Sequence, residues 1–258
     1  MQDFVKVLTD FPVAIDSPDH LSPWGTSRDN SKNIRFNHKL YSLFANNRSP
    51  LKIMDLGCSG GGFVNTCLDQ GCFAIGLEGS DYSRKHCRAE WPKLSDRFLF
   101  TADISRDFTV VQNDNPINFD VITSWEVLEH IPEERLSTVA QNIYKHLENN
   151  GLAIISISPN EETIKGQKLH LTIREKDWWI QFFKEFKLHY ISAYETYFNT
   201  QFIRGPKQNA PGSFHLFLVK DTLHAPKIPP TKFIEKLFDR WHMSYFQKRI
   251  RYILGIIE

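Results

Sequence analysis

Residues 52–63 read Lys52-Ile-Met-Asp-Leu-Gly-Cys-Ser-Gly-Gly-Gly-Phe63, a short apolar run that passes an aspartate and ends in a glycine-rich turn. The run 52–56 has the length and composition of a buried strand, and a helix is expected at 63–69, directly after the glycines. Glycines let the backbone turn sharply and approach a ligand closely. In open α/β sheets, ligands bind at the carboxyl ends of the strands. The stretch therefore predicts an α/β sheet with a ligand site at this turn.

Strands and helices alternate on the carboxyl-terminal side of the turn. The pattern predicts strands at 72–77, 98–102, 119–124 and 152–157, and helices at 81–91 and 132–147. Such alternation is typical of a parallel sheet that is doubly wound, with helices on both faces. We also expect helices at 37–44, 174–186 and 231–254, and strands at 188–198 and 213–219. The predicted organisation is an N-terminal lid or substrate segment (1–48), a central domain (49–222), and a C-terminal linker with a basic amphipathic helix (223–258).

The composition is that of an ordinary globular protein. The chain has 258 residues and a formal net charge of +1, with 41% hydrophobic and 24% charged residues. No apolar run approaches the roughly 20 residues that span a bilayer, and residues 1–9 lack the apolar core of a secretory signal. The four cysteines form no CxxC pair, so we expect reduced thiols and a cytoplasmic protein. Residues 1–130 carry a charge of −4 and residues 131–258 a charge of +5, which is no strong nucleic-acid signal.

Three acidic residues follow the first three predicted strands. Asp55 precedes the glycine turn, Glu78 ends the second strand at the distance suited to ribose hydroxyls, and Asp103 ends the third, where it can reach an adenine amino group. A dinucleotide would place its pyrophosphate at the helix N-terminus, where Asp55 would repel it. The same carboxylate suits the cationic methionyl moiety of S-adenosylmethionine. A nucleotide-free α/β domain, whose glycines only turn the chain, is the alternative.

In this combination, residues 50–160 resemble class I S-adenosylmethionine-dependent methyltransferases, with Ser59 in place of the usual middle glycine. The resemblance implies a Rossmann-like, doubly wound, mostly parallel seven-stranded sheet with helices on both faces and an antiparallel last strand. It also implies an S-adenosylmethionine site formed by Asp55, Gly57, Ser59, Gly61, Glu78, Gly79, Asp103, Ile104, Ser124 and Trp125.

A second motif, Glu126-Val-Leu-Glu129-His130, runs from the fourth predicted strand into the following helix. Residues three apart share a helix face, so we expect Glu126 and Glu129 to converge, with His130 beside them and His170 arriving from the loop after the fifth strand. Carboxylates and imidazoles can bind a divalent ion, which would lower the pKa of an acceptor hydroxyl and orient it. A histidine acting alone as general base, and an acidic helix start without chemistry, stay open as alternatives.

The Glu-x-x-Glu-His motif resembles that of small-RNA 3′-terminal 2′-O-methyltransferases and of metal-dependent O-methyltransferases of ubiquinone synthesis. This resemblance implies Mg²⁺ or Mn²⁺ at the residues expected to be catalytic: Glu126, Glu129, His130 and His170. The whole chain is also similar to methyltransferases encoded beside glycosyltransferases in bacteria and viruses, through Ser17-Pro-Asp-His20, Leu77-Glu-Gly-Ser-Asp-Tyr82 and Lys176-Asp-Trp-Trp179. That similarity implies O-methylation of a sugar hydroxyl in a glycan. An RNA 3′ end, a small phenol, and donor binding without turnover are the alternatives.

Two outer segments carry features of their own. Residues 22–30 could form a lid, in which Trp24 stacks on a ring while Arg28 and Asn30 offer hydrogen bonds. The last predicted helix has apolar residues at helical spacing, namely Ile234, Leu237, Phe238, Trp241 and Tyr245. Its basic residues are Lys232, Lys236, Arg240, Lys248, Arg249 and Arg251. It could lie on an anionic membrane surface, or pack on its own domain or a partner subunit.

Overall fold

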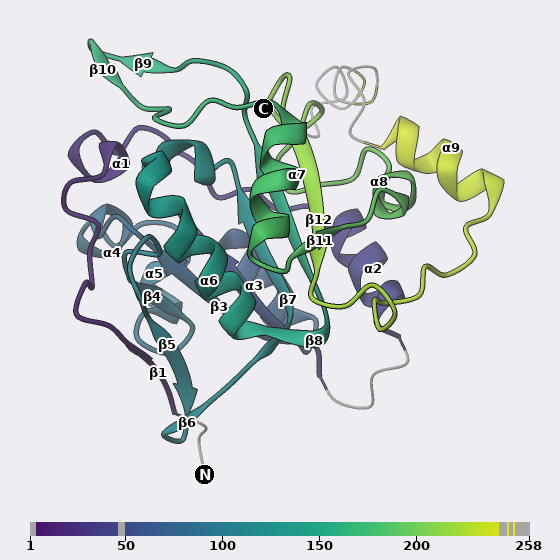
Figure 1. Cartoon of the computed structure of the whole chain (residues 1–258), viewed down its shortest axis with the longest axis horizontal. Helices are drawn as coiled ribbons and strands as arrows, with labels where there is room; N and C mark the ends of the chain where they lie inside the picture. Colours follow the sequence, from purple (N-terminus) through teal and green to yellow (C-terminus); the bar gives the residue numbers. More distant parts are fainter. Residues whose placement is uncertain (1–3, 46–49, 243–246, 248–249, 251–258) are drawn as a thin grey trace.

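The computed structural model describes residues 4–45, 50–242, 247 and 250. Its centre is a seven-stranded sheet with the order β11-β12-β8-β7-β2-β3-β4 (Figure 1). The five strands from β8 to β4 pair in parallel, and β12 pairs antiparallel to β8, which confirms the predicted Rossmann-like sheet with an antiparallel last strand. The strands are β2 (Lys52–Leu56), β3 (Phe73–Glu78), β4 (Leu99–Thr101), β7 (Phe119–Trp125), β8 (Leu147–Ile157), β11 (His189–Tyr190) and β12 (Phe214–Val219).

Helices cover both faces of this sheet (Figure 1). One apolar core joins the sheet to α6 and α7, and the other joins it to α2, α3 and α8. Because both faces are covered, all seven residues of β7 are buried. The helices are α1 (Pro18–Leu21), α2 (Ile34–Leu43), α3 (Gly62–Asp69), α4 (Tyr82–Lys85), α5 (Trp91–Leu94), α6 (Leu136–His146), α7 (Lys176–Glu185), α8 (Ala193–Phe198) and α9 (Phe233–Trp241), with 3-10 turns η1 (Leu128–His130) and η2 (Glu133–Arg135).

A small antiparallel sheet, absent from the sequence prediction, fixes the start of the chain. It has the order β1-β5-β6, in which β1 (Val5–Leu8) pairs with β5 (Thr109–Gln112), and β5 with β6 (Asn115–Pro116). From β1 the chain crosses the carboxyl ends of the large sheet, where the Ala14 amide donates to the Gly79 carbonyl at 2.9 Å. This anchoring places the N-terminal segment over the predicted ligand site. A short hairpin of β9 (Thr163–Ile164) and β10 (Gln167–Lys168) follows β8.

Two predicted elements are wrong in extent or type. The helix expected at 81–91 is only the single turn α4, because Cys87 and Ala89 adopt left-handed backbone angles (φ 49° and 50°) that interrupt it. The strand expected at 188–198 is limited to β11, and its second half is the helix α8. Tyr194, Tyr197 and Phe198 are all buried on α8, and this spacing of three and four residues is that of a helix face, whereas a strand would put Tyr197 on the other face.

The helix expected at 231–254 is described only as α9 and two isolated later residues. Tyr245, Lys248, Arg249 and Arg251 lie outside the described residues. Within the described part of the chain, no helix combines the length and apolar character needed to cross a membrane.

His146, at the end of α6, gives the fold a pH dependence. Its side chain is 2% exposed, its Nε2 accepts from the Val110 amide of β5 at 3.2 Å, and its Nδ1 lies 2.9 Å from the Asn142 carbonyl. The neutral tautomer with hydrogen on Nδ1 satisfies both contacts. Burial lowers the pKa of His146 to about 4. Between this pH and about 6.5, the ring is neutral in the folded protein and protonated in the unfolded chain.

We therefore expect the free energy of unfolding to fall as the pH drops from 6.5 towards 4, with a contribution from His146 of up to about 3 kcal/mol. A folded-state pKa below the unfolded value means that this stability is fully present above pH 6.5 and is lost on acidification. Urea denaturation at several pH values measures it. His146→Gln should flatten the acid limb, whereas His38→Gln, at an exposed site, should leave it in place. An acid limb of the same steepness in both variants would contradict the assignment.

Candidate functional site

The glycine turn has a backbone that only small residues tolerate. Gly57 and Gly61 adopt φ of 76° and 81°. A Cβ on Gly57 would lie 2.3 Å from Cγ2 of Val127, and one on Gly61 would lie 2.5 Å from Cδ1 of Leu99. Ser59 stands at φ 47° and donates its hydroxyl to the Asp29 carbonyl at 2.8 Å. The serine thus links the turn to the N-terminal segment.

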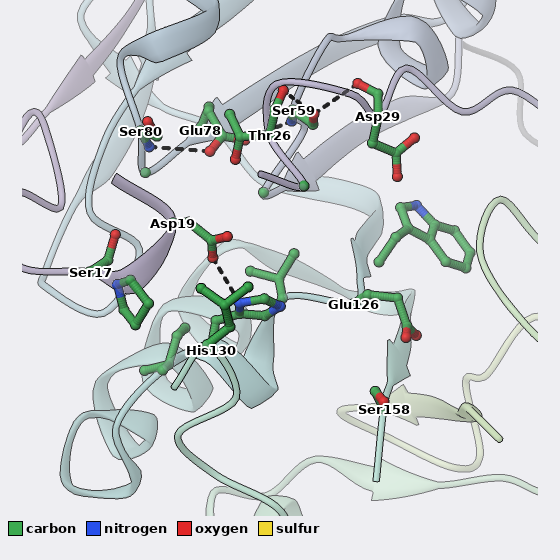
Figure 2. Close-up of a pocket in the computed structure, with 18 of the residues that line it drawn as sticks. Ser17, Asp19, Thr26, Asp29, Ser59, Glu78, Ser80, Glu126, His130 and Ser158 are labelled. Carbon is green, nitrogen blue, oxygen red and sulfur yellow. Dashed lines mark hydrogen bonds and ion pairs between the residues drawn. The ribbon is translucent and has the colours of Figure 1, made fainter. Parts of the chain in front are cut away.

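Two buried carboxylates lie beside this turn. Asp55 accepts from the Thr123 hydroxyl at 2.6 Å, and Glu78 accepts from the backbone amides of Ser59 at 2.6 Å and Ser80 at 3.1 Å (Figure 2). Burial raises the pKa of Asp55 to about 8 and that of Glu78 to about 7. A cationic ligand at this point would stabilise both ionised carboxylates.

Most of the predicted donor-binding residues line one cavity of about 860 Å³, a size typical of ligand sites. Those on its wall are Asp55, Gly57, Ser59, Glu78, Gly79, Asp103, Ile104 and Trp125. Gly61 is not on the wall and occupies the N-cap position of α3. Ser124 is fully buried and donates to the Leu56 carbonyl at 3.0 Å, so it joins β7 to β2. Asp103 accepts from the amide and hydroxyl of Ser105.

The N-terminal segment forms the roof of the same cavity. Trp24, Arg28 and Asn30 lie on its wall, and the Arg28 guanidinium stacks 3.5 Å from the Trp24 ring centroid. Arg88, which follows α4, donates to the Ser27 carbonyl at 2.7 Å and to that of Asp29 at 2.7 Å. The break in the predicted helix at 81–91 is what brings Arg88 to this segment.

Three of the four residues of the predicted metal site converge at the other end of the cavity. The ligand atoms of Glu129, His130 and His170 all lie within 4.8 Å of one another. Glu129 is fully buried; its Oε1 accepts from the Ser158 amide at 2.9 Å, while its Oε2 has no hydrogen-bond partner. The Glu129 carbonyl accepts from the amides of residues 171 and 172, which holds the His170 loop in place.

Glu126 does not join this group, contrary to the helical spacing argument. Its φ of 56° shows that the turn there is not helical, and η1 starts only at Leu128. Figure 2 shows the Glu126 carboxylate turned away from His130. Its Oε2 accepts from the Ser213 hydroxyl at 2.7 Å, and its Oε1 has no hydrogen-bond partner. Burial raises the pKa of both Glu126 and Glu129.

Two carboxylates that the sequence analysis did not select face the two histidines. Asp19 of α1 places Oδ2 2.9 Å from Nδ1 of His130 (Figure 2), and Glu162 places Oε2 3.2 Å from Nε2 of His170. Burial alone would lower the pKa of His130, but the charge and hydrogen bond of Asp19 outweigh it and raise the pKa to about 9. Asp19 belongs to the Ser-Pro-Asp-His motif of residues 17–20, to which the sequence analysis assigned no role in the site. His130 is therefore protonated near neutral pH and is not free to act as a base unless a cation displaces the proton.

Comparison with known proteins agrees with this geometry. Residues 29–197, more than half of the chain, match the family model described as a methyltransferase domain. A ubiquinone biosynthesis O-methyltransferase of Rickettsia conorii is 27% identical over 127 residues, which are 47% of this chain and 42% of that protein. The chain thus spans less than half of this curated relative.

Solved methyltransferases share the fold. An S-adenosylmethionine-dependent methyltransferase from Clostridium acetobutylicum aligns with a TM-score of 0.51 at 13% identity, covering 73% of this chain and 92% of that one. The magnesium protoporphyrin IX methyltransferase of Synechocystis, solved with bound S-adenosylmethionine, gives 0.50 at 15% identity, covering 79% and 93%.

If Glu78 holds the ribose of the donor, Glu78→Gln should weaken binding of S-adenosylhomocysteine by about 1.5–3 kcal/mol, the usual worth of hydrogen bonds to a charged group. Glutamine keeps the size of the side chain and an acceptor oxygen for the turn. Isothermal titration calorimetry measures the change. Asp96→Asn, which alters an exposed ion pair with Arg84, is the control. Equal affinity in the wild type and Glu78→Gln would remove Glu78 from the donor site.

Proposed function

The chain belongs to the methyltransferase-domain family, the class I S-adenosylmethionine-dependent methyltransferases, and on this basis we propose that it methylates a hydroxyl oxygen of a neutral, sugar-like acceptor with the help of a divalent ion. The observation that carries the proposal is the convergence of Glu129, His130 and His170. The two histidines lie on the wall of the donor cavity. A carboxylate with two imidazoles is a donor set that Mn²⁺ and related divalent ions accept.

The residues present fit such an ion. Glu129 Oε2 is buried and unpartnered, so a positive charge there would satisfy it. Asp19 contacts Nδ1 of His130, and the Asn160 carbonyl contacts Nδ1 of His170, as carboxylates and carbonyls commonly do behind metal-binding imidazoles. Nε2 of each ring is then the nitrogen that would hold the ion, and Glu162 lies beside that of His170. When bound, the ion would lower the pKa of an acceptor hydroxyl and hold its oxygen in position.

The residues of the chain supply the rest of the reaction. The carboxylates of Asp55 and Glu78 favour the cationic donor, which becomes neutral at sulfur when its methyl group leaves. In the transfer, the bond between methyl carbon and sulfur breaks with its electron pair left on sulfur, a bond to the acceptor oxygen forms, and the hydroxyl proton passes to solvent water. The roof of Trp24, Arg28 and Asn30 limits water around the donor.

The acceptor is proposed to be uncharged because the basic side chains on the cavity wall are already engaged. Among the described lining residues, Arg135 contacts Asp16 at 2.6 Å, Arg204 lies 3.4 Å from Asp29, and Arg28 stacks on Trp24. Aromatic faces such as Trp24 and Trp125 suit the apolar face of a sugar ring, while the surrounding carboxylates suit its hydroxyls. The named activity of the curated relatives supports oxygen as the methylated atom.

We expect exhaustive chelation to abolish methyl transfer, and added Mg²⁺ or Mn²⁺ to restore it, while binding of S-adenosylhomocysteine stays unchanged. Glu129→Gln should remove the response to metal. Asp19→Asn should raise the metal concentration needed for half-maximal activity by about 10–100-fold, the usual effect of losing a carboxylate behind a metal-binding histidine. Asp16→Asn, in the same segment but paired with Arg135, should leave the metal requirement unchanged. Full activity after chelation would refute the ion while leaving the methyltransferase assignment intact.

The neutral acceptor predicts a weak dependence on salt. Each phosphate contact of a single-stranded nucleic acid would add a slope of roughly 0.7 to the logarithmic salt dependence of affinity, whereas a sugar should add almost none. Release of S-adenosylhomocysteine with sugar, catechol and RNA acceptors at low and physiological salt measures this. A steep salt dependence with RNA preferred, or turnover of catechol alone, would contradict the sugar assignment.

A further inference from the structure

Helix α9 packs with its polar side on the domain and its apolar side outward. Asp239 is fully buried, with Oδ1 2.7 Å from Nε of Arg35 and Oδ2 2.7 Å from Nζ of Lys39, both on α2. The large apolar side chains of the helix are 45–76% exposed: Phe233, Ile234, Leu237, Phe238 and Trp241. Figure 1 shows α9 at the periphery of the molecule, beside α2.

The two sides of α9 are opposite each other. At about 100° per residue, the five exposed apolar side chains occupy an arc of about 140°, and Asp239 lies opposite its centre. A helix that only completes a domain buries its apolar face and exposes its polar one. In α9 the arrangement is reversed: Asp239 is buried, and the apolar side chains stay 45–76% exposed, with Phe238 reaching the Arg35 guanidinium at the edge of the face.

The polar side of α9 is held firmly. The Asp239 carbonyl accepts from the side chains of Thr200 at 2.8 Å and Gln201 at 2.7 Å, and the buried carboxylate is neutralised by Arg35 and Lys39. The same loop continues to Ile203 and Arg204, which line the donor cavity. The outward apolar face is therefore fixed relative to the active site.

We propose that the exposed face of α9, formed by Phe233, Ile234, Leu237, Phe238 and Trp241 with the flanking cations Lys236 and Arg240, docks on an anionic lipid bilayer. An interfacial helix buries an apolar, aromatic face at the headgroup level and keeps Lys and Arg near anionic lipids. Both cations are exposed. The segment 222–258 carries a formal charge of +4, and its one buried acidic residue is already neutralised within the domain.

Other occupants fit the charges less well. In a symmetric dimer the same patch meets itself, so Lys236 and Arg240 would be brought close to their own copies. The remaining C-terminal residues of the chain include Lys248, Arg249 and Arg251, which would again bring like charges together. An anionic surface is the occupant that complements both the apolar face and its cations.

Co-sedimentation of the full chain with vesicles tests the proposal. The protein should bind phosphatidylcholine vesicles that contain phosphatidylglycerol, and bind vesicles of phosphatidylcholine alone much more weakly. Ile234→Ser with Leu237→Ser should weaken partitioning at least tenfold, because apolar surface is lost from the membrane face. Lys236→Gln with Arg240→Gln should weaken it roughly 30-fold.

Matched controls separate docking from misfolding. Leu223→Ser changes an apolar side chain that is 88% exposed but lies outside α9, and Lys184→Gln removes an exposed cation from α7. Both should bind vesicles as the wild type does, and all variants should keep its melting temperature and its affinity for S-adenosylhomocysteine.

Three outcomes would overturn the proposal. Equal binding to neutral and anionic vesicles, or binding unaffected by the α9 changes, would assign the lipid contact elsewhere. A dimer in sedimentation equilibrium that dissociates in the Ile234→Ser and Leu237→Ser variant, without vesicle binding, would make the face a subunit interface. A monomer that binds no vesicles would show that this face is not a membrane contact.

Discussion

The structure depends on carboxylates buried at the carboxyl edge of the sheet. Asp55, Glu78 and Glu129 are each at most 5% exposed, and their hydrogen bonds come from hydroxyl and backbone amide groups. Such donors offset only part of the cost of burying a negative charge. The raised pKa values of Asp55 and Glu78 reflect the part of this cost that remains. Positive ligands would offset the rest of this cost, which supports the proposed sites: the cationic methyl donor beside Asp55 and Glu78, and the divalent ion at Glu129.

One short segment connects the two charged ends of the cavity. Residues 24–31 are held over the glycine turn by Arg88 and Ser59, and a few residues earlier Asp19 reaches His130. The small sheet of β1 and β5 fixes where this segment begins. The same N-terminal segment thus contacts the glycine turn at one end of the cavity and His130 at the other.

The sequence alone predicted correctly those elements whose conformation is determined by neighbouring residues. The run 52–56 matches β2 residue for residue, because a buried parallel strand followed by glycines has few other readings. It failed where long-range contacts decide. Strand β1 exists only through a partner about a hundred residues away, and Arg88 leaves its helix to bind a distant segment. The spacing of Glu126 and Glu129 suggested a common face, but this holds only on a helix, and the left-handed backbone at Glu126 directs its carboxylate to Ser213.

Helix α9 is another case in which a long-range contact, not the local sequence pattern, decides the arrangement. Its sequence predicted an amphipathic helix correctly, but amphipathicity does not state which face meets the domain. The answer lies in Arg35 and Lys39 on α2, two cations separated by one helical turn that need a carboxylate between them. Asp239 supplies it, and because a buried carboxylate without these partners would be strongly unfavourable, the pairing sets which side of α9 faces the domain. A helix fixed in this way has no need of its apolar face for folding, which leaves that face available for a surface outside the molecule.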